Sequence, residues 1–188
     1  MDGPTRLTLA AQRGETQALE ALVESTYDSV WRLCATIVDG QSGDDLAQET
    51  YVRVIRSLPR FGGQSSARTW ILSIARHTAL DELRARSRRR HRDRTLAAMT
   101  EGARAAADET GQDAEATDLL RHLETDRRTA FVLTQLLGLS YEEAGRVCGC
   151  PVGTIRSRVA RARGDLIAIL GRPLSGAQGS SGPRRGVR

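Results

Sequence analysis

The chain has 188 residues, room for one medium-sized domain or two small ones, and its aromatic content of 4% is too low for large aromatic cores or base-stacking platforms. All 28 basic residues are arginine and outnumber the 23 acidic residues, and the net charge of +5 indicates a polyanionic partner. No segment approaches the ~18 apolar residues of a membrane span, and the N-terminus has no charged-then-apolar leader, so we expect a cytoplasmic protein without membrane insertion.

The first half of the chain carries a helical pattern almost throughout. Apolar residues at helical spacing predict one helix from Leu19 to Val38, a second from Leu46 to Leu58, and a third from Trp70 to Leu83. Pro59 ends the second helix, because proline cannot continue a helical hydrogen-bond ladder. No alternation of β-branched and polar residues between hairpin turns occurs, so the fold class is predicted to be all-α.

An acidic cluster opens the second predicted helix. We expect Ser42 to cap this helix, and Asp44 and Asp45 to complement its positive end. Gln48 and Glu49 lie one turn further along and are not needed for capping, so they leave a polar face that favours docking of a protein partner. Asp45 and Glu49 could also hold Mg²⁺, but two carboxylates from one helix make a poor cage, and we favour the docking face.

The third predicted helix begins after a Gly/Ser loop and continues into a basic stretch. Residues 60–94 contain ten arginines, and the loop begins at Gly62. A loop of small polar residues before a cationic helix can hold an unstacked base of single-stranded DNA. We expect Trp70 in the core and the arginine run over residues 86–94 on phosphates. The exposed strip of the helix is predicted to contain Arg76, His77, Leu80, Asp81 and Arg84.

Composition changes between the two halves of the chain. Residues 96–116 are mostly alanine, glycine and acidic residues, which cannot bury a core, so we predict a flexible acidic linker there. Helical pattern resumes at Leu119. The sequence therefore predicts two small helical domains, over residues 1–95 and 117–170, and a disordered tail over residues 171–188.

The segment that starts at Ser140 has the sequence features of a helix-turn-helix. Ser140 and Glu143 form an S-x-x-E capping box for a short helix, Gly149 follows as a turn residue, and Pro151 suits the first position of a second helix. Gly145, in the middle of the first helix, costs roughly 1 kcal/mol relative to alanine. We therefore expect a steric reason for this glycine, namely close approach of the second helix.

The second helix of this motif separates an apolar stripe from an arginine-rich face. The stripe comprises Ile155, Val159, Ala162, Leu166, Ile169 and Leu170. The opposite side and its margins carry Thr154, Arg156, Ser157, Arg158, Ala160 and Arg161. Arginine can donate two parallel hydrogen bonds to a guanine edge, and small residues let the backbone approach DNA. A solvated amphipathic helix fits this pattern equally well on its own, and the preceding helix and turn favour the DNA-reading interpretation.

The cysteines indicate neither a metal site nor a disulfide framework. Cys148 and Cys150 form a C-x-C pair without a nearby histidine to complete a zinc site, and Cys34 is far away in the sequence. We expect reduced thiols that pack in the interior, rather than a redox switch. No metal or cofactor is predicted.

Three stretches of this sequence resemble the extracytoplasmic-function (group IV) sigma factors of bacterial RNA polymerase. GDDLAQETYVRVIRSLPRF is similar to region 2.2, RTWILSIARHTALDELR to regions 2.3 and 2.4, and GLSYEEAGRVCGCPVGTIRSRVARARGDL to region 4.2. The resemblance extends from about Leu7 to Leu170. It implies that residues 1–95 form sigma region 2 and residues 117–170 form region 4. It also implies a protein without catalytic activity that binds core polymerase and directs promoter-specific initiation.

By position, the resemblance implies three binding sites. The polymerase β′ clamp helices would contact Asp44, Asp45, Gln48 and Glu49. Capture of a flipped base and other contacts with the minus-10 element fall to Phe61, Gly63, Gln64, Ser65, Ser66, Arg68, Arg76, His77, Asp81 and Arg84. Contacts with the minus-35 element fall to Thr154, Arg156, Ser157, Arg158, Ala160 and Arg161. The resemblance further implies contact with the polymerase β flap, a linker that follows the basic cleft of polymerase, and silencing by an anti-sigma factor.

Two other classes of function remain open from the residues themselves. A conventional helix-turn-helix regulator would bind a duplex operator without polymerase, as a dimer on a palindrome. A nuclease would use Asp44, Asp45 and Glu49, but the sequence offers no supporting histidines or further carboxylates for such a site. We favour the sigma factor.

Overall fold

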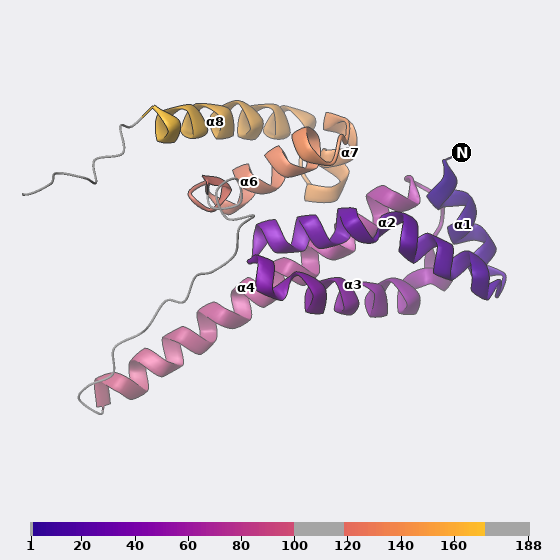
Figure 1. Ribbon diagram of the computed structural model, residues 1–188, viewed down its shortest axis with the longest axis horizontal. Coiled ribbons are helices and arrows are strands. Elements are labelled where there is room, and N and C mark those ends of the chain that lie inside the picture. Colours follow the sequence, from indigo (N-terminus) through magenta and orange to yellow (C-terminus); the bar gives the residue numbers. More distant parts are fainter. Residues whose placement is uncertain (1, 100–118, 172–188) are drawn as a thin grey trace, which may run out of the picture.

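The computed structural model describes residues 2–99 and 119–171 (Figure 1). All regular elements in these ranges are helical, which confirms the all-α fold class. The first range holds α1 (Gly3–Gln12), α2 (Thr16–Ile37), α3 (Gly43–Ser57) and α4 (Ala67–Met99), with short 3-10 turns at Gly40–Ser42 and Leu58–Arg60. The second range holds α6 (Thr125–Phe131), a π-helical turn (Val132–Leu136), α7 (Tyr141–Cys148) and α8 (Val152–Leu170).

The first four helices form a bundle around α2. This helix contacts α1, α3 and α4, and Figure 1 shows α2 and α3 side by side with α4 crossing behind them. Leu22, Leu33 and Ile71 are fully buried in the bundle. Complete burial of such a side chain contributes roughly 1.5–3 kcal/mol each to stability. These apolar residues recur at helical spacing in the sequence. They therefore form part of the core that α2, α3 and α4 share.

The later helices form a second, smaller layer. α8 packs against both α6 and α7, and the residues that fill the space between them include Leu133, Val147, Ile155 and Val159, all nearly inaccessible to solvent. The predicted apolar stripe of α8 is confirmed as far as Leu166, which is half-buried. Leu170 was predicted on the same stripe, but it is largely exposed, because α8 extends past the end of α6 at this point (Figure 1).

The two layers pack directly on each other. α7 contacts α4 and α6 contacts α2, so one continuous cluster of buried residues includes members of both halves. The proposed division at residues 95 and 117 stays a prediction. α4 continues to Met99, so the first four residues of the predicted linker are helical. The remainder of that linker, and the tail beyond Gly171, lie outside the described residues.

The start of α3 differs from the expected cap. Ser42 precedes the helix, but its hydroxyl makes no capping hydrogen bond and instead accepts one from Arg86 of α4. Asp39 accepts a hydrogen bond of 2.8 Å from the amide of Ser42 and also pairs with Arg86. The Ser42 hydroxyl, which the sequence predicted to cap α3, is therefore bound by Arg86 instead.

In the part of the chain that the structure describes, none of the helices could cross a membrane.

Candidate functional site

The helix-turn-helix forms as the sequence predicts. The amide of Glu143 donates to the Ser140 hydroxyl at 3.1 Å, and the amide of Ser140 donates to the Glu143 carboxylate at 2.9 Å, which completes the capping box. Gly149 ends α7 with φ of 64°, in the left-handed region that glycine adopts without strain. Pro151 lies one residue earlier than expected, as the residue that caps α8.

The steric reason for Gly145 is a close backbone contact. A Cβ atom at this position would lie 2.9 Å from the carbonyl oxygen of Cys150, nearer than real Cβ atoms approach. The neighbour is thus the turn between the helices, and the expected contact with the second helix itself is limited to Val152, 3.9 Å away. This glycine sets the close spacing of α7 and the turn.

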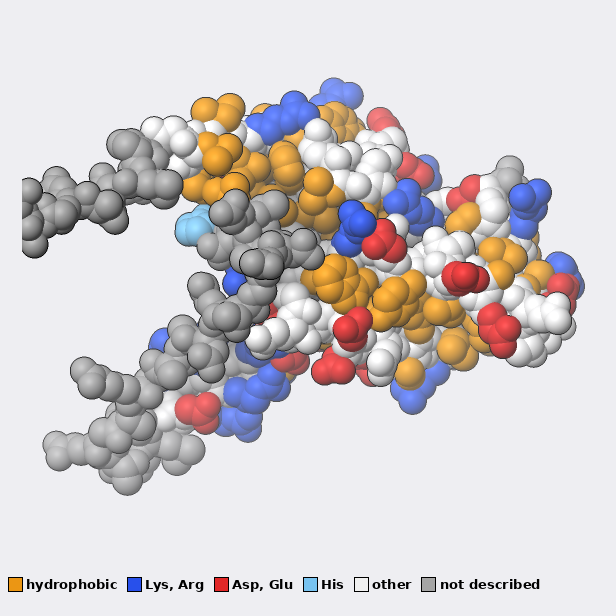
Figure 2. All heavy atoms as spheres, in the orientation of Figure 1, with side chains coloured by type: hydrophobic (Ala, Val, Ile, Leu, Met, Phe, Trp, Pro, Cys, Tyr) orange, Lys and Arg blue, Asp and Glu red, His pale blue; other side chains and the backbone are white. Residues whose placement is uncertain are grey.

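One face of α8 is exposed and carries most of the residues predicted to contact DNA. Arg156, Ser157, Ala160 and Arg161 are exposed, whereas Thr154 at the margin is half-buried. Figure 2 shows basic side chains along the outer edge of the molecule over this helix. Arg158 differs from its neighbours, because only 22% of its side chain is exposed. It pairs with Asp126 of α6 and donates to the sulfur of Cys150 at 3.5 Å.

The loop before α4, residues 61–66, has an exposed tip and anchored ends. Gly62, Gly63 and Gln64 are exposed, whereas Ser65 and Ser66 are half-buried. Phe61 is only 7% exposed, because its ring packs on Trp70 with the ring centres 4.9 Å apart. Trp70, expected in the core, is half-buried and packs against it. Phe61 supports the loop from inside and presents little surface to a ligand.

Two arginines predicted for minus-10 contact lie between the two layers. Arg68 donates to the carbonyl oxygen of Leu137 at 2.8 Å and to the hydroxyl of Ser29 at 3.2 Å. Arg76 has a side chain that is 12% exposed and pairs with Asp126 at 3.5 Å. Its Nε is buried without a hydrogen-bond partner among the described residues. Both guanidinium groups are thus engaged inside the protein in this arrangement.

Asp126 joins two of the predicted DNA-binding surfaces. Its carboxylate pairs with Arg76 of α4 and with Arg158 of α8. Sequence reasoning missed this residue, because an aspartate in the first turn of a helix is explained by the helix dipole alone. Only the fold brings it within reach of the two arginines.

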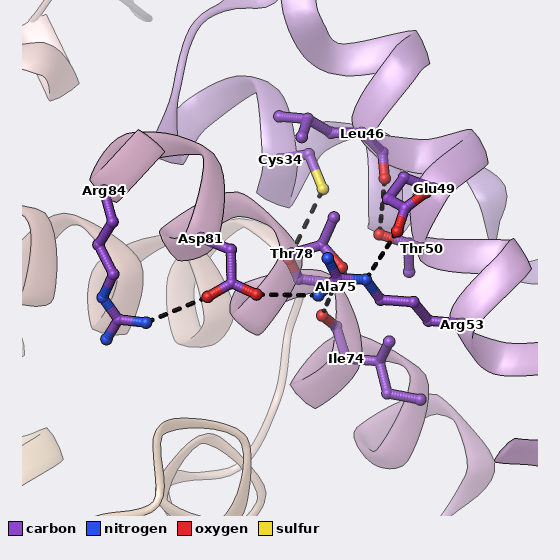
Figure 3. Close-up of polar contacts among 10 residues, drawn as sticks. All are labelled: Cys34, Leu46, Glu49, Thr50, Arg53, Ile74, Ala75, Thr78, Asp81 and Arg84. Atoms are coloured by element: carbon purple, nitrogen blue, oxygen red, sulfur yellow. Dashed lines mark hydrogen bonds and ion pairs between the residues drawn. The ribbon is translucent and has the colours of Figure 1, made fainter. Parts of the chain in front are cut away.

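The exposed side of α4 carries the remaining candidates. His77, Asp81 and Arg84 are all exposed. Leu80 was predicted on the same exposed strip, but it is half-buried and packs against the core. Arg53 of α3 donates to Asp81 at 3.0 Å, and Arg84 donates to the same carboxylate at 3.2 Å (Figure 3). The hydrogen bond from Arg53 holds the pKa of Asp81 below its ordinary value. The aspartate is therefore a carboxylate at neutral pH, fixed in place by cations on both sides.

The acidic cluster lies on the surface of α3. Asp44, Asp45, Gln48 and Glu49 are all exposed. Glu49 accepts from Arg53 at 2.9 Å, and this arginine links the cluster to Asp81 (Figure 3). Asp44 accepts from the hydroxyl of Tyr27 at 2.9 Å, and this hydrogen bond raises the pKa of the tyrosine. The cluster thus contacts α2 directly and is linked to α4 through Arg53.

An open apolar groove of about 700 Å³ borders this cluster, between α2 and α3. Its lining residues are Leu19, Glu20, Val23, Glu24, Tyr27, Asp28 and Ile55. Figure 2 shows apolar side chains over α2 and α3 with acidic side chains around them. Val52 and Ile55 belong to the apolar residues that predicted the helix from Leu46 to Leu58, but they are 41% and 47% exposed. We call the four residues of the acidic cluster, together with this groove, the docking surface.

The cysteines are free thiols, and Cys34 and Cys148 are buried. Burial raises the pKa of each of these two to about 11, which keeps them protonated and unreactive at neutral pH. Within residues 2–99 and 119–171, no group of three or more histidine, cysteine, aspartate or glutamate side chains could hold a metal ion.

Comparison with known proteins identifies both halves of this arrangement. The family model described as Sigma-70 region 2 matches residues 22–89, and the model described as Sigma-70, region 4 matches residues 113–166. The first match contains the docking surface apart from Leu19 and Glu20. The second contains the helix-turn-helix as far as Leu166, four residues before α8 ends.

Relatives that match most of the chain agree with these models. The chain is 51% identical over 169 residues to the ECF RNA polymerase sigma factor SigC of Mycobacterium tuberculosis. The aligned stretch covers 87% of this chain and 89% of the relative. It is 39% identical to the RNA polymerase sigma-H factor of Pseudomonas aeruginosa, over 84% of this chain and 89% of the relative.

Solved structures show the same fold. The structure of CnrH in complex with the cytosolic domain of CnrY matches with a TM-score of 0.71 and 25% identity, over 90% of this chain and 97% of that one. The sigma factor RpoE of Bartonella quintana, in complex with the anti-sigma factor NepR, matches with a TM-score of 0.63 and 25% identity, over 80% and 95% of the two chains. The chain belongs to the extracytoplasmic-function RNA polymerase sigma factors.

Proposed function

We propose that this sigma factor binds core RNA polymerase through its docking surface and reads its promoter through two separate DNA surfaces. One observation carries the proposal: a single chain exposes an acidic and apolar surface together with a helix-turn-helix whose second helix presents arginines. A DNA-binding module alone would need only the second surface. The first is explained by attachment to a large protein partner.

The docking surface suits the β′ clamp helices of polymerase. Its floor is apolar, so burial against a helix is favourable, and the acidic residues at its rim favour a partner with basic side chains. Asp45, Gln48, Val52 and Ile55 follow helical spacing along one side of α3 and are exposed, so a partner helix can meet all of them at once. Asp44 and Glu49 flank this line.

The exposed face of α8 suits the minus-35 element. Arg156 and Arg161 would donate to guanine edges or phosphates in the major groove, and Ser157 and Ala160 would allow close approach of the helix. Thr154 and Arg158 lie at the margins, where phosphate contact is the expected role.

The 61–66 loop and the outer side of α4 suit the minus-10 element. The exposed loop residues Gly63 and Gln64, with Ser65 and Ser66 behind them, would receive an unstacked base. Phe61 would support this loop from within. His77, Asp81 and Arg84 would contact the neighbouring bases and phosphates of the open strand.

Promoter binding would require the two layers of the protein to separate. Arg68 and Arg76 are candidates for DNA contact, yet each binds a residue of the second layer, and Arg158 pairs with Asp126, the partner of Arg76. Core polymerase would stabilise the open arrangement if it binds that arrangement more tightly than the closed one, because a ligand shifts an equilibrium only by its difference in affinity for the two states. The β flap would then receive the second layer.

The protein would act in the cytoplasm without catalytic activity, under the control of an anti-sigma factor. Two structural neighbours are described as complexes with CnrY and with the anti-sigma factor NepR, and this likeness in fold supports a similar partner here. The docking surface is the candidate site for such a partner, since its occupation would exclude polymerase.

In vitro transcription from a library of genomic promoters tests the proposal. We expect transcripts from a defined promoter set only when core polymerase and the chain are both present. Alanine at Asp45, Gln48 and Glu49 should abolish this activity and leave the helical content unchanged, because all three side chains are exposed. Tight, sequence-specific binding to duplex DNA by the free chain would instead support the helix-turn-helix regulator.

A further inference from the structure

We propose that the N-terminal helix α1 positions the 61–66 loop for base capture, through Gln12 at one end of the loop and Thr5 at the other. The inference rests on the proposed role of this loop at the minus-10 element and adds the residues that hold it in shape. α1 spans Gly3–Gln12 and lies outside the stretch that matches the Sigma-70 region 2 model, residues 22–89.

Gln12 fixes the start of the loop. Its side-chain amide donates to the carbonyl oxygen of Leu58 at 2.8 Å and to that of Phe61 at 2.9 Å. The amide nitrogen has two hydrogens, and each has one of these carbonyls as its acceptor. The chain therefore leaves the 3-10 turn at Leu58–Arg60 in one direction, and the Phe61 ring is held where it packs on Trp70.

Thr5 fixes the end of the loop. Its hydroxyl accepts a hydrogen bond of 2.9 Å from the amide of Ala67, the first residue of α4. Thr5 is 8% exposed and Ala67 is fully buried, so water is not available to replace this bond. Ser66 caps the same helix end, because its hydroxyl accepts from the amide of Thr69 at 3.2 Å.

Both anchors come from one rigid helix. Thr5 and Gln12 are seven residues apart and lie on the same face of α1, so one element sets the distance between the two ends of the loop. Between the anchors, Gly62 and Gly63 have wide conformational freedom, and ordering each residue costs on the order of 1–2 kcal/mol. A loop held at both ends has lost part of this freedom before DNA arrives, so less ordering remains to be done on binding.

The test uses holoenzyme assembled from core polymerase and the full chain. Fork-junction probes of a promoter selected by transcription carry either the matched bases or one mismatch, placed in the single-stranded minus-10 element or in the duplex minus-35 element. The measured quantity is the ratio of affinities for matched and mismatched probes at each position. A ratio is unaffected by a lower fraction of folded protein, so a merely structural defect leaves it unchanged.

Two pairs of variants probe the two anchors. Gln12→Glu keeps the shape of the side chain and removes both donors, and Gln17→Glu makes the same charge change at an exposed position of α2. Thr5→Val keeps the branched shape and removes the acceptor, whereas Thr5→Ser retains a hydroxyl. We expect Thr5→Val, which loses one hydrogen bond, to reduce minus-10 discrimination at the captured base by roughly fivefold, and Gln12→Glu, which loses two, to reduce it by at least as much. Gln17→Glu and Thr5→Ser should retain it, and minus-35 discrimination should not change.

The outcomes separate the inference from the proposed function. Wild-type discrimination at the minus-10 element in both Gln12→Glu and Thr5→Val would overturn the positioning role of α1. An equal loss of discrimination at both elements would overturn it as well. If wild-type holoenzyme itself shows no base preference in the single-stranded element, the role of the loop in promoter reading fails first.

Discussion

Arg68 at the start of α4 donates a 2.8 Å hydrogen bond to the carbonyl oxygen of Leu137, where the π-helical turn ends. The contact joins residues 69 positions apart and ties the proposed minus-10 surface to the layer that carries the helix-turn-helix. About two turns further along α4, Arg76 makes a second such contact with Asp126. The same side chains are therefore placed either to hold the layers together or to contact DNA.

The first prediction concerns this closed arrangement. Asp126→Asn removes the charge that pairs with both Arg76 and Arg158, and with Arg68→Met it deletes the polar contacts that join the layers at these points. We expect the double variant to expand, with a larger radius of gyration by small-angle X-ray scattering, and to associate faster with core polymerase.

Asp165→Asn is the matched control for that experiment. Asp165 pairs with Arg127 at 2.8 Å and is exposed to a similar degree as Asp126, but both partners belong to the second layer. This variant should keep the wild-type radius and association rate. Equal radii and rates for the double variant and the wild type would show that the arginines do not hold the layers together.

The second prediction concerns the turn of the helix-turn-helix. Gly145→Ala places a methyl group 2.9 Å from the Cys150 carbonyl oxygen, which is backbone and cannot rotate away. Although alanine is the better helix former, we expect a net loss of roughly 1–3 kcal/mol in the free energy of unfolding, as for other overpacked sites. Urea unfolding followed by circular dichroism measures this change.

A glycine of α8 provides the comparison. Gly164 is exposed, and a Cβ there would meet nothing within 4 Å, so Gly164→Ala should stabilise the protein by roughly 0.4–1 kcal/mol. The two alanine substitutions thus have opposite expected signs. Stabilisation by Gly145→Ala would contradict the close contact in the turn.

The helix-turn-helix and the contacts of Asp126 show how much of the structure could be predicted from the sequence. The capping box, Gly149 and the apolar stripe of α8 depend on residues within one or two turns of each other, so local pattern sufficed. Asp126 and its two arginines are far apart in sequence, and no periodicity marks them as partners. Val52 and Ile55 fit a helical apolar stripe as well as Val54 does, yet Val54 is buried, whereas Val52 and Ile55 are exposed and Ile55 lines the groove. The reason is that α2 and α4 cover only part of α3.

The third prediction is a pH dependence set by Arg86. The hydrogen bond from Arg86 lowers the pKa of Glu82 below its ordinary value of 4.5. Burial raises the pKa of Asp39, but hydrogen bonds from Arg86 and Ser42 outweigh it, and the net shift is downward. Both carboxylates have a lower pKa folded than unfolded, so they stabilise the fold above the unfolded pKa, and this stabilisation is lost as the pH falls through the folded pKa.

Replacement of Arg86 by methionine should therefore flatten this part of the pH profile. We expect the free energy of unfolding of the wild type to fall between pH 5 and pH 3 more steeply than that of Arg86→Met, by urea titration at each pH. Arg60→Met removes one exposed positive charge and should retain the wild-type slope. Parallel profiles for the wild type and Arg86→Met would show that Asp39 and Glu82 have the same pKa in the folded and the unfolded protein.

The fourth prediction concerns thiol reactivity. With a pKa of about 11, Cys34 and Cys148 have roughly one thiolate per thousand molecules at pH 8, and both are buried. We expect a thiol reagent to modify Cys150, which is half-buried, first, and to reach the other two only when the protein unfolds. Mass spectrometry of timed samples resolves the three sites. Rapid labelling of Cys148 in the folded protein would revive the redox switch that the sequence left open.

The last prediction tests the apolar part of the docking surface. Ile55 lines the groove and is 47% exposed, so Ile55→Glu adds a fourth carboxylate beside Glu20, Glu24 and Asp28 without removing a core side chain. We expect a large loss of affinity for core polymerase, measured by fluorescence anisotropy, because the partner would bury an unpaired charge. Ile167→Glu makes the same change at an exposed site of α8 far from the groove and should bind normally. Circular dichroism of both variants should match that of the wild type, which shows that neither substitution unfolds the protein. Equal affinities for Ile55→Glu and the wild type would place polymerase elsewhere on the chain.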